Sequence, residues 1–372
     1  MYFVVSAGGT AGHINPALAV ADELRGRGHE VAFVGTDDRM ESRLVPEAGF
    51  EFAGLSVAGF DKARPWTLLS SAAKLLSATR KVEGMFSGQR PDAVLGFGAY
   101  VSIPVGRAAH AMHIPLVIHE QNSVPGMANG YLARRADVTA LTYAASRRSL
   151  KPKGECIVCG NPVRKSVEES DRAAGRAVLG IGEDATAVLV TGGSLGAHRL
   201  NAAVCALKEQ LLAVDGLVVV HSTGAADLDF VKEALSLTPA QEARWKVFPY
   251  IERMGECMAA CDFAVSRAGA SSLAELAALQ LPAVLVPYPH ARGDHQTLNA
   301  RAYVDSGAAV LVADADVEGV QFSSAVLGLA ADARRRATMR KACEGLSGAN
   351  ARRTLADVAV RLAKTKGCEG AS

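Results

Sequence analysis

The chain has 372 residues, too many for one ordinary hydrophobic core, which indicates about two domains. Hydrophobic residues make up 49% and charged residues 21%, a composition that excludes an intrinsically disordered chain. Aromatic residues contribute 5% and the net charge is +2, so neither supports nucleic-acid binding. The charge is uneven, because residues 1–165 carry 19 Lys and Arg against 14 Asp and Glu, giving +5, whereas the remainder carries −3.

The first residues and the cysteines indicate where the protein resides. The opening MYFVVSAGGTAGH is typical of a β-strand and a glycine-rich turn rather than a signal peptide. The sequence contains no uninterrupted run of about 18 apolar residues, so we expect no transmembrane helix. Seven scattered cysteines favour free thiols in a reducing cytoplasm. Cys156 and Cys159 have CxxC spacing without a second pair or a nearby histidine, so we interpret them as strand residues and expect no metal site.

Predicted strands and helices alternate along the chain. In the first half, apolar runs predict strands at residues 2–7, 30–35, 93–96 and 115–119, and a helix at residues 16–25, with Pro16 in its first turn. In the second half, similar runs predict strands at residues 187–191, 217–222, 246–249, 263–266 and 283–287, and a helix at residues 202–212. This alternation is typical of parallel α/β sheets.

One strand–turn–helix unit occurs twice, about 180 residues apart. The two openings read AGGTAGHINPALAVADEL and TGGSLGAHRLNAAVCALKEQL, and such a repeat predicts two doubly wound α/β domains. A linker is expected near Gly160 to Lys165. We therefore predict an N-terminal domain over residues 1–163, a C-terminal domain over residues 164–345, and a helix and tail over residues 346–372 that packs back on the N-terminal domain.

Glycine-rich turns follow four predicted strands, at residues 8–12, 96–100, 192–196 and 268–272. A turn that leads into a helix offers backbone N–H groups and the positive end of the helix dipole to a phosphate group. The GxxxxGK[ST] loop of P-loop nucleotide hydrolases is absent, and Val101 occupies the third glycine position of the dinucleotide pattern GxGxxG. The turns therefore favour a phosphate-containing ligand other than those of P-loop hydrolases or dehydrogenases.

Several polar residues near these turns each allow two interpretations. His13 follows the first turn and is either a base in the cleft or a capping, solvated residue. Glu275, in SSLAELAAL, either accepts hydrogen bonds from ribose hydroxyls or is only a favourable negative charge near the N-terminus of its helix. The Asp-x-Asp pairs at Asp227 and at Asp314 match a cation-binding spacing, but we interpret both as solvated surface residues.

The segment from Arg64 to Arg90 combines an apolar stripe with flanking cations. This pattern is typical of a peripheral membrane contact, and the alternative is that its leucines pack on the sheet of their own domain.

Seven motifs in order resemble the MurG family of bacterial peptidoglycan glycosyltransferases, from about residue 3 to about residue 365. They are GGTAGHINPALAVADEL, GFGAYVSIP, HEQNSVPGMANGYLAR, GNPVR, TGGSLGAHRLN, SRAGASSLAEL and DHQTLNAR. The resemblance implies the GT-B architecture, in which two Rossmann-like domains face a cleft. It also implies an inverting transfer of N-acetylglucosamine from UDP-N-acetylglucosamine to the 4-hydroxyl of undecaprenyl-pyrophosphoryl-N-acetylmuramoyl-pentapeptide, without a cofactor or metal.

The resemblance also implies roles for individual residues. His13 is the candidate base, and Tyr100 and Asn122 are expected near the acceptor or the sugar. Ile251 is expected beside the uracil, Glu275 on the ribose, and Arg164 and Ser194 near the diphosphate. The remaining expected binding residues line the sugar, the diphosphate or the nucleotide: Thr10, Ala11, Gly12, Ala270, Ser271, Ser272, Leu273, Ala274, His295 and Gln296. Ala11 and Ala99 depart from the usual GGTGGH and GFGGY, and we expect both to be tolerated.

An acceptor with a polyprenyl anchor requires a site at the bilayer surface. The resemblance therefore favours the membrane interpretation of the segment from Arg64 to Arg90, with a peripheral location on the cytoplasmic face of the membrane. The +5 first half agrees with docking on an anionic leaflet. Two other functions remain open, a UDP-sugar epimerase on the same scaffold and a UDP-sugar-binding scaffold protein without catalysis.

Overall fold

The computed structural model describes residues 1–57, 67–193, 196–346, 348 and 350–369. The chain divides into two compact units. Unit 1 comprises Met1–Arg164 with Gly348–Ser372, and unit 2 comprises Lys165–Ser347.

The described residues of unit 1 form a seven-stranded parallel sheet in the order β3-β2-β1-β4-β5-β6-β7. Its strands are β1 (Tyr2–Ser6), β2 (Glu30–Thr36), β3 (Glu51–Leu55), β4 (Ala93–Gly96), β5 (Leu116–Glu120), β6 (Val138–Leu141) and β7 (Glu155–Val158). Its helices are α1 (Ala11–Gly26), α2 (Glu41–Glu47), α3 (Thr67–Gly88), α4 (Ser102–Ala111), α5 (Met127–Leu132), α6 (Ser146–Leu150) and α18 (Ala351–Glu369).

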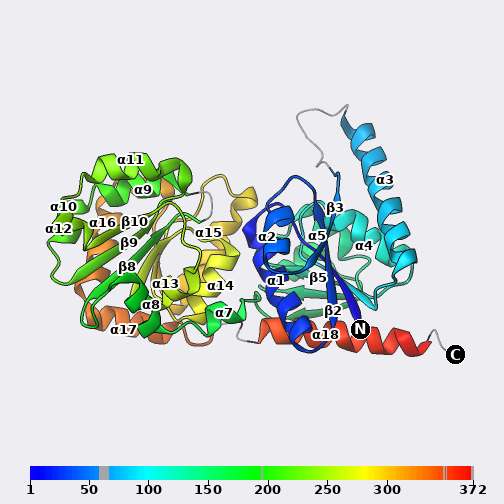
Figure 1. The fold of residues 1–372 in the computed structure, drawn as a ribbon. Coiled ribbons are helices and arrows are strands. Elements are labelled where there is room, and N and C mark those ends of the chain that lie inside the picture. Colours follow the sequence, from blue (N-terminus) through cyan, green and yellow to red (C-terminus); the bar gives the residue numbers. More distant parts are fainter. Residues whose placement is uncertain (58–66, 194–195, 347, 349, 370–372) are drawn as a thin grey trace. The chain divides into compact units, whose positions relative to one another are not determined.

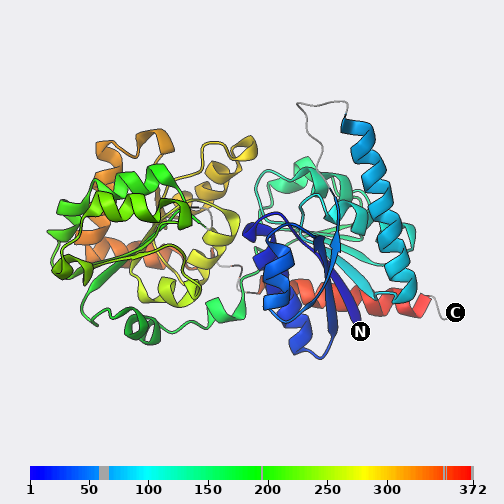
Figure 2. The same ribbon diagram turned by 45° about the horizontal axis from the view of Figure 1, so that its top comes forward.

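Both faces of this sheet are covered. Phe3 and Val5 of β1 join Leu24 of α1 and Leu355 of α18 in one core, whereas Val4 joins residues of α3, α4 and α6 in the other. Alternate side chains of a strand point to opposite faces, so β1 contributes to both cores. Figure 1 shows α18 beside α1, and Figure 2, turned by 45°, shows α3 on the opposite side of the sheet.

The described residues of unit 2 form a six-stranded parallel sheet in the order β10-β9-β8-β11-β12-β13. Its strands are β8 (Thr186–Thr191), β9 (Leu217–Ser222), β10 (Trp245–Phe248), β11 (Phe263–Ser266), β12 (Ala283–Leu285) and β13 (Ala309–Leu311). Its α-helices are α7 (Lys165–Glu168), α8 (Arg172–Leu179), α9 (His198–Cys205), α10 (Lys208–Leu212), α11 (Leu228–Leu235), α12 (Pro239–Glu242), α13 (Met254–Ala260), α14 (Ala270–Ala278), α15 (His295–Ser306), α16 (Val320–Ala331) and α17 (Ala333–Ala342). Val188 and Leu189 of β8 lie in two different cores, one on each face.

The prediction of two doubly wound α/β domains is confirmed, with local corrections. Helix α1 begins at Ala11, five residues before its predicted start, because Thr10 is the extended N-cap residue and Pro16 lies inside the helix. The helix predicted at residues 202–212 is two helices, α9 and α10. Strands β3, β6 and β13 were not predicted, because runs of three to five residues carry little periodicity.

The sheet orders bring the four glycine-rich turns together in pairs. In unit 1 the order reverses between β1 and β4, where Ser6 is paired with Gly96, so the first and second turns are neighbours. In unit 2 it reverses between β8 and β11, where Thr191 is paired with Ser266, so the third and fourth turns are neighbours. Ligands of doubly wound sheets bind at such switch points, outside the carboxyl ends of the strands.

Candidate active site

The first glycine-rich turn of unit 1 leads from β1 directly into α1. Gly9 adopts a φ of 83°, and Ala11, Gly12 and His13 form the first turn of the helix. Oγ1 of Thr10 lies 3.4 Å from Nδ1 of His13. The positive end of the helix dipole lies here, so the turn has the electrostatics of an anion site.

Glu41, which the sequence analysis did not single out, supports this turn through hydrogen bonds. It is fully buried, and its carboxylate accepts from the N–H groups of Gly9 and Thr36, each at 3.0 Å. A Cβ atom on Gly8 would lie 2.3 Å from Oε1 of Glu41, so only glycine fits beside the carboxylate. A single glutamate at a helix start normally predicts a surface residue, and no sequence pattern separates Glu41 from that class.

The second glycine-rich turn follows β4 and lies against the first. Gly98 and Ala99 both have a positive φ, of 90° and 62°. A Cβ atom on Gly98 would lie 2.9 Å from Cδ2 of His13, so the imidazole packs closely on this turn. Tyr100 follows, half-buried, and burial raises the pKa of its phenol. His13 and Tyr100 therefore belong to one edge of the unit 1 sheet.

The loop after β5 is organised by a second buried carboxylate. Glu120 is 1% exposed and accepts from the N–H of Asn122 at 3.0 Å and from Nδ2 of Asn129 at 2.9 Å. Burial raises the pKa of this carboxyl group, and these hydrogen bonds oppose the rise. Asn129 also donates to the carbonyl oxygen of His119 at 2.9 Å, and a Cβ atom on Gly98 would lie 3.5 Å from its Nδ2. Asn129 thereby joins the loop of Asn122 to the second turn.

The GNPVR motif (Gly160–Arg164) contains further polar groups of the candidate site in unit 1. Nε2 of His119 lies 3.0 Å from the carbonyl oxygen of Gly160, and burial lowers the pKa of His119 to about 4. The neutral imidazole therefore donates to Gly160 at physiological pH. Nε of Arg164 is buried without a hydrogen-bond partner among the described residues.

In unit 2, the turn after β8 is closely packed. Gly193 and Gly196 have φ values of 86° and 78°, and a Cβ atom on Gly196 would lie 2.4 Å from the carbonyl oxygen of Thr223. Asn201 of α9, not predicted as a site residue, donates from Nδ2 to Thr223 at 2.9 Å and to Asp227 at 2.8 Å. Ser194, the predicted phosphate ligand, lies outside the described residues.

Helix α14 begins at the fourth turn, with Gly269 as its extended N-cap residue. Ala270 and Leu273 are buried, and Leu273 belongs to the core, so only its backbone is available to a ligand. The other predicted residues of this helix are half-buried: Ser271, Ser272, Ala274 and Glu275.

Gln296 connects two loops at the carboxyl edge of the unit 2 sheet. Its Oε1 accepts from the N–H groups of Ala268 at 3.2 Å and Tyr288 at 2.9 Å, which fixes the orientation of the amide. His295 precedes it, with Nδ1 3.0 Å from the carbonyl oxygen of Arg292. Ile251 is half-buried against the core that contains Leu273.

The Asp-x-Asp pairs require a correction. Asp314 is 8% exposed and pairs with Arg267 at 2.6 Å, and Asp227 accepts from Asn201, so neither is simply a solvated surface residue. Burial beside charged or amide donors, which spacing does not reveal, accounts for the difference. Within the described ranges, no group of three or more His, Cys, Asp or Glu side chains is placed to hold a metal ion.

Only part of the segment from Arg64 to Arg90 is described. Phe86 is 2% exposed and lies in the core, whereas Leu75 is half-buried and Leu76 is 43% exposed, so the described leucines do not all pack on the sheet as the alternative interpretation expects. The exposed side chains of α3 include Lys74, Leu76 and Arg80. In the part of the chain that the structure describes, no helix is long and apolar enough to cross a membrane.

Comparisons with known proteins agree with this architecture. Residues 3–141 match the glycosyltransferase family 28 N-terminal domain, and residues 187–358 match the glycosyltransferase family 28 C-terminal domain. A UDP-N-acetylglucosamine–N-acetylmuramyl-(pentapeptide) pyrophosphoryl-undecaprenol N-acetylglucosamine transferase of Halothermothrix orenii is 36% identical over 369 residues, covering 98% of this chain and all of that protein. The transferase of the same name from Lactiplantibacillus plantarum is 38% identical, covering 91% of this chain and 93% of that protein.

Solved structures share the fold of this chain. The MurG structure of Acinetobacter baumannii matches with a TM-score of 0.73 and 28% identity, covering 97% of this chain and 99% of that one. A Listeria monocytogenes protein described as a UDP-N-acetylglucosamine 2-epimerase has a TM-score of 0.70 at 14% identity, covering 95% and 94%, and so shares the fold alone. Because both units match domains of glycosyltransferase family 28 and the identity to these transferases extends over nearly the full chain, the chain belongs to the MurG family of glycosyltransferases.

Proposed function

We propose that this protein transfers N-acetylglucosamine from UDP-N-acetylglucosamine to the 4-hydroxyl of undecaprenyl-pyrophosphoryl-N-acetylmuramoyl-pentapeptide in peptidoglycan synthesis. The observation that carries the proposal is the pairing of glycine-rich turns at the switch point of each sheet. The full-length identity with transferases of this name favours transfer over epimerisation and over a scaffold without catalysis.

The reaction is a single displacement at the anomeric carbon of the donor sugar. The acceptor oxygen bonds to this carbon while the bond to the diphosphate breaks, and UDP leaves with the bonding electrons. The acceptor proton passes to a base, and the configuration inverts. The protein must position two substrates and stabilise the charge that develops on the diphosphate. Helix N-termini and Arg164 supply positive potential for this, and we propose that neither a metal nor a cofactor takes part.

His13 is the proposed base for the acceptor hydroxyl. Oγ1 of Thr10 lies 3.4 Å from Nδ1 of His13, and we propose that Nδ1–H donates to this oxygen, which leaves the lone pair on Nε2. Nε2 faces the turn at Gly98, where a Cβ atom would lie 3.2 Å from it. We place Tyr100 and Asn122 at the acceptor or the sugar. Tyr100 follows the second turn, which lies against His13, and Asn129 joins the loop of Asn122 to that turn.

The proposed donor site belongs to unit 2. Glu275 accepts from the ribose hydroxyls, the backbone of Ile251 bonds the uracil edge, and Ser194 bonds the diphosphate. Because Oε1 of Gln296 is held by two backbone N–H groups, its NH₂ group is the end that meets the sugar hydroxyls, with His295 beside it. Along the nucleotide, unit 2 also contributes Ala270, Ser271, Ser272, Leu273 and Ala274. In unit 1, we propose that Thr10, Ala11 and Gly12 bind near the sugar and the diphosphate, and that Arg164 binds near the diphosphate.

We propose a peripheral location on the cytoplasmic face of the membrane, with α3 as the contact. Lys74, Leu76 and Arg80 are exposed on this helix, and residues 1–165 carry a net charge of +5. An exposed leucine among cations suits the interface of an anionic leaflet. Docking there would bring the acceptor's sugar to the protein while its polyprenyl chain stays in the bilayer.

The direct test measures UDP release from UDP-N-acetylglucosamine with and without a short-chain lipid acceptor. We expect UDP release only with the acceptor. In the His13→Ala protein we expect the rate of release to fall about 10²–10⁴-fold, which is the usual contribution of a general base. His110→Ala, an exposed histidine of the same unit, is the matched control and keeps the original rate. Equal release with and without acceptor would contradict transfer, and a folded His13→Ala protein with near-normal turnover would contradict the assignment of the base.

A further inference from the structure

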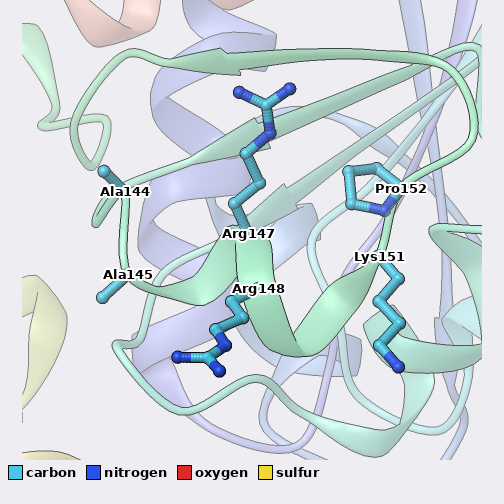
Figure 3. A pocket seen from close by; sticks show the side chains of 6 residues that line it. All are labelled: Ala144, Ala145, Arg147, Arg148, Lys151 and Pro152. Carbon is cyan, nitrogen blue, oxygen red and sulfur yellow. The ribbon is translucent and has the colours of Figure 1, made fainter.

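A shallow hollow lies beside α6 in unit 1 (Figure 3). Its volume is about 680 Å³, and it is lined by Ala144, Ala145, Arg147, Arg148, Lys151 and Pro152. Helix α6 has five residues and ends at Leu150, and its C-cap residue Lys151 has a left-handed conformation (φ 49°) that turns the chain towards Pro152. In sequence, the three cations of the lining lie between the alanines at one end and Pro152 at the other.

The three cations of this hollow are exposed. Arg147, Arg148 and Lys151 form no ion pair with any residue that the structure describes. In Figure 3, Arg148 and Lys151 point to one side of the α6 ribbon and Arg147 points to the other. Three like charges within five residues repel one another, so an anionic ligand would relieve this repulsion. Cations on two sides suit a ligand with more than one negative group.

Helix α6 is fixed to the loop that carries Asn122. Oγ of Ser146 donates to the carbonyl oxygen of Asn122 at 2.9 Å and lies 3.4 Å from that of Ser123. Ala144 and Ala145 immediately precede Ser146, so the neutral edge of the hollow adjoins this loop. A ligand bound at Asn122 can therefore extend into the hollow.

We infer that the hollow binds the carboxylates of the acceptor's stem peptide. The inference rests on the proposed function, in which Asn122 meets the acceptor. Guanidinium groups bind carboxylates through two parallel hydrogen bonds, and a short peptide presents at least its C-terminal carboxylate. A bilayer surface is a poorer occupant, because no lining residue is a large apolar side chain of the kind that anchors a protein in the interface.

The test compares two acceptors on the same lipid, one with the complete pentapeptide and one whose lactyl group ends in an uncharged amide. The Arg147→Gln/Arg148→Gln protein should show about a tenfold higher KM for the peptide acceptor, from the loss of exposed charge-assisted bonds, with kcat nearly unchanged. Its KM for the amide acceptor should stay unchanged. Arg353→Gln/Lys364→Gln removes two exposed cations of α18, on the other face of the sheet, and should change neither KM.

Each other result overturns the inference. An equal rise in both KM values would mean that the substitutions disturb the loop of Asn122. Weaker binding to vesicles of phosphatidylglycerol and phosphatidylcholine, with both KM values in detergent unchanged, would assign the hollow to lipid headgroups. No change in any measurement would make the three cations solvated surface residues. Failure of the proposed function is a separate result, since the unsubstituted protein would then release no UDP with either acceptor.

Discussion

Ala99 and Ala11 are the two departures from the motifs GFGGY and GGTGGH noted in the sequence analysis, and the structure gives the two positions opposite requirements. Ala99 has a φ of 62° in the second turn, a conformation that costs a residue with a Cβ atom about 1–2 kcal/mol. Ala11 is the first residue of α1, where alanine is favoured over glycine. The expected tolerance of both alanines is therefore physically different at the two sites.

This difference predicts opposite effects of the same substitution. Ala99→Gly should raise the free energy of unfolding by up to about 1 kcal/mol, because relief of the left-handed strain exceeds the entropy that glycine loses. Ala11→Gly should lower it by about 0.5–1 kcal/mol, because glycine weakens a helix. Urea unfolding of the two single variants measures both. A lower stability for Ala99→Gly would contradict the positive φ.

The hydrogen bonds of Glu41 to the first turn predict that this residue positions the turn. In Glu41→Gln, an NH₂ group replaces one of the oxygens that accept from Gly9 and Thr36, so one buried N–H loses its acceptor. We expect a loss of about 1–3 kcal/mol of stability and, at 25 °C, a higher KM for the acceptor, because the first turn shifts. Glu47→Gln, an exposed residue of the same helix, is the control. An unchanged KM in a folded Glu41→Gln protein would reduce Glu41 to a structural residue.

At the scale of elements, the sequence predicts the turns better than their supports. All four turns are visible as glycines after apolar runs, and Pro16 misplaces only the start of α1. Glu41, Asn129 and Asn201 were missed because each acts through partners that are distant in sequence or through burial, and neither leaves a pattern. The pairing of the turns also depends on strand order, which no local pattern contains.

Helix α3 yields a prediction about membrane binding. Lys74→Gln/Arg80→Gln should weaken binding to vesicles with anionic lipid by roughly thirtyfold, since each cation near such a surface contributes about 1 kcal/mol. Co-sedimentation with vesicles measures the change, and the loss should shrink at high salt. Arg353→Gln/Lys364→Gln carries the same change in charge on α18. Equal losses in both proteins would show that net charge, and not α3, determines binding.

At the scale of the whole molecule, each unit contains one deeply buried histidine, His119 in unit 1 and His221 in unit 2. Burial lowers the pKa of each to about 4. Well above pH 6.5 the histidine is neutral in the folded and the unfolded protein. As the pH falls from 6.5 towards 4, the unfolded chain binds a proton that the folded protein excludes, so stability falls. Glu120 acts in the opposite sense, because its raised pKa favours the folded protein on acidification.

The prediction is a loss of unfolding free energy between pH 7 and pH 5, on the order of 2 kcal/mol for each histidine and partly offset by Glu120 in unit 1. Urea unfolding at the two pH values measures it. His221→Gln should reduce the pH dependence, whereas the exposed His110→Gln should leave it unchanged. A stability that rises on acidification over this range would contradict the burial of the two imidazoles.

The central claim is that two parallel-sheet units, each with paired glycine-rich turns, form a transferase and not an epimerase on the same scaffold. Mass spectrometry and NMR of the products, after incubation with UDP-N-acetylglucosamine and the lipid acceptor, test it most directly. The account predicts one N-acetylglucosamine added to the lipid-linked sugar through an inverted anomeric linkage, with one UDP released for each transfer. Free N-acetylglucosamine, or an epimerised UDP-sugar with the acceptor unchanged, would contradict it.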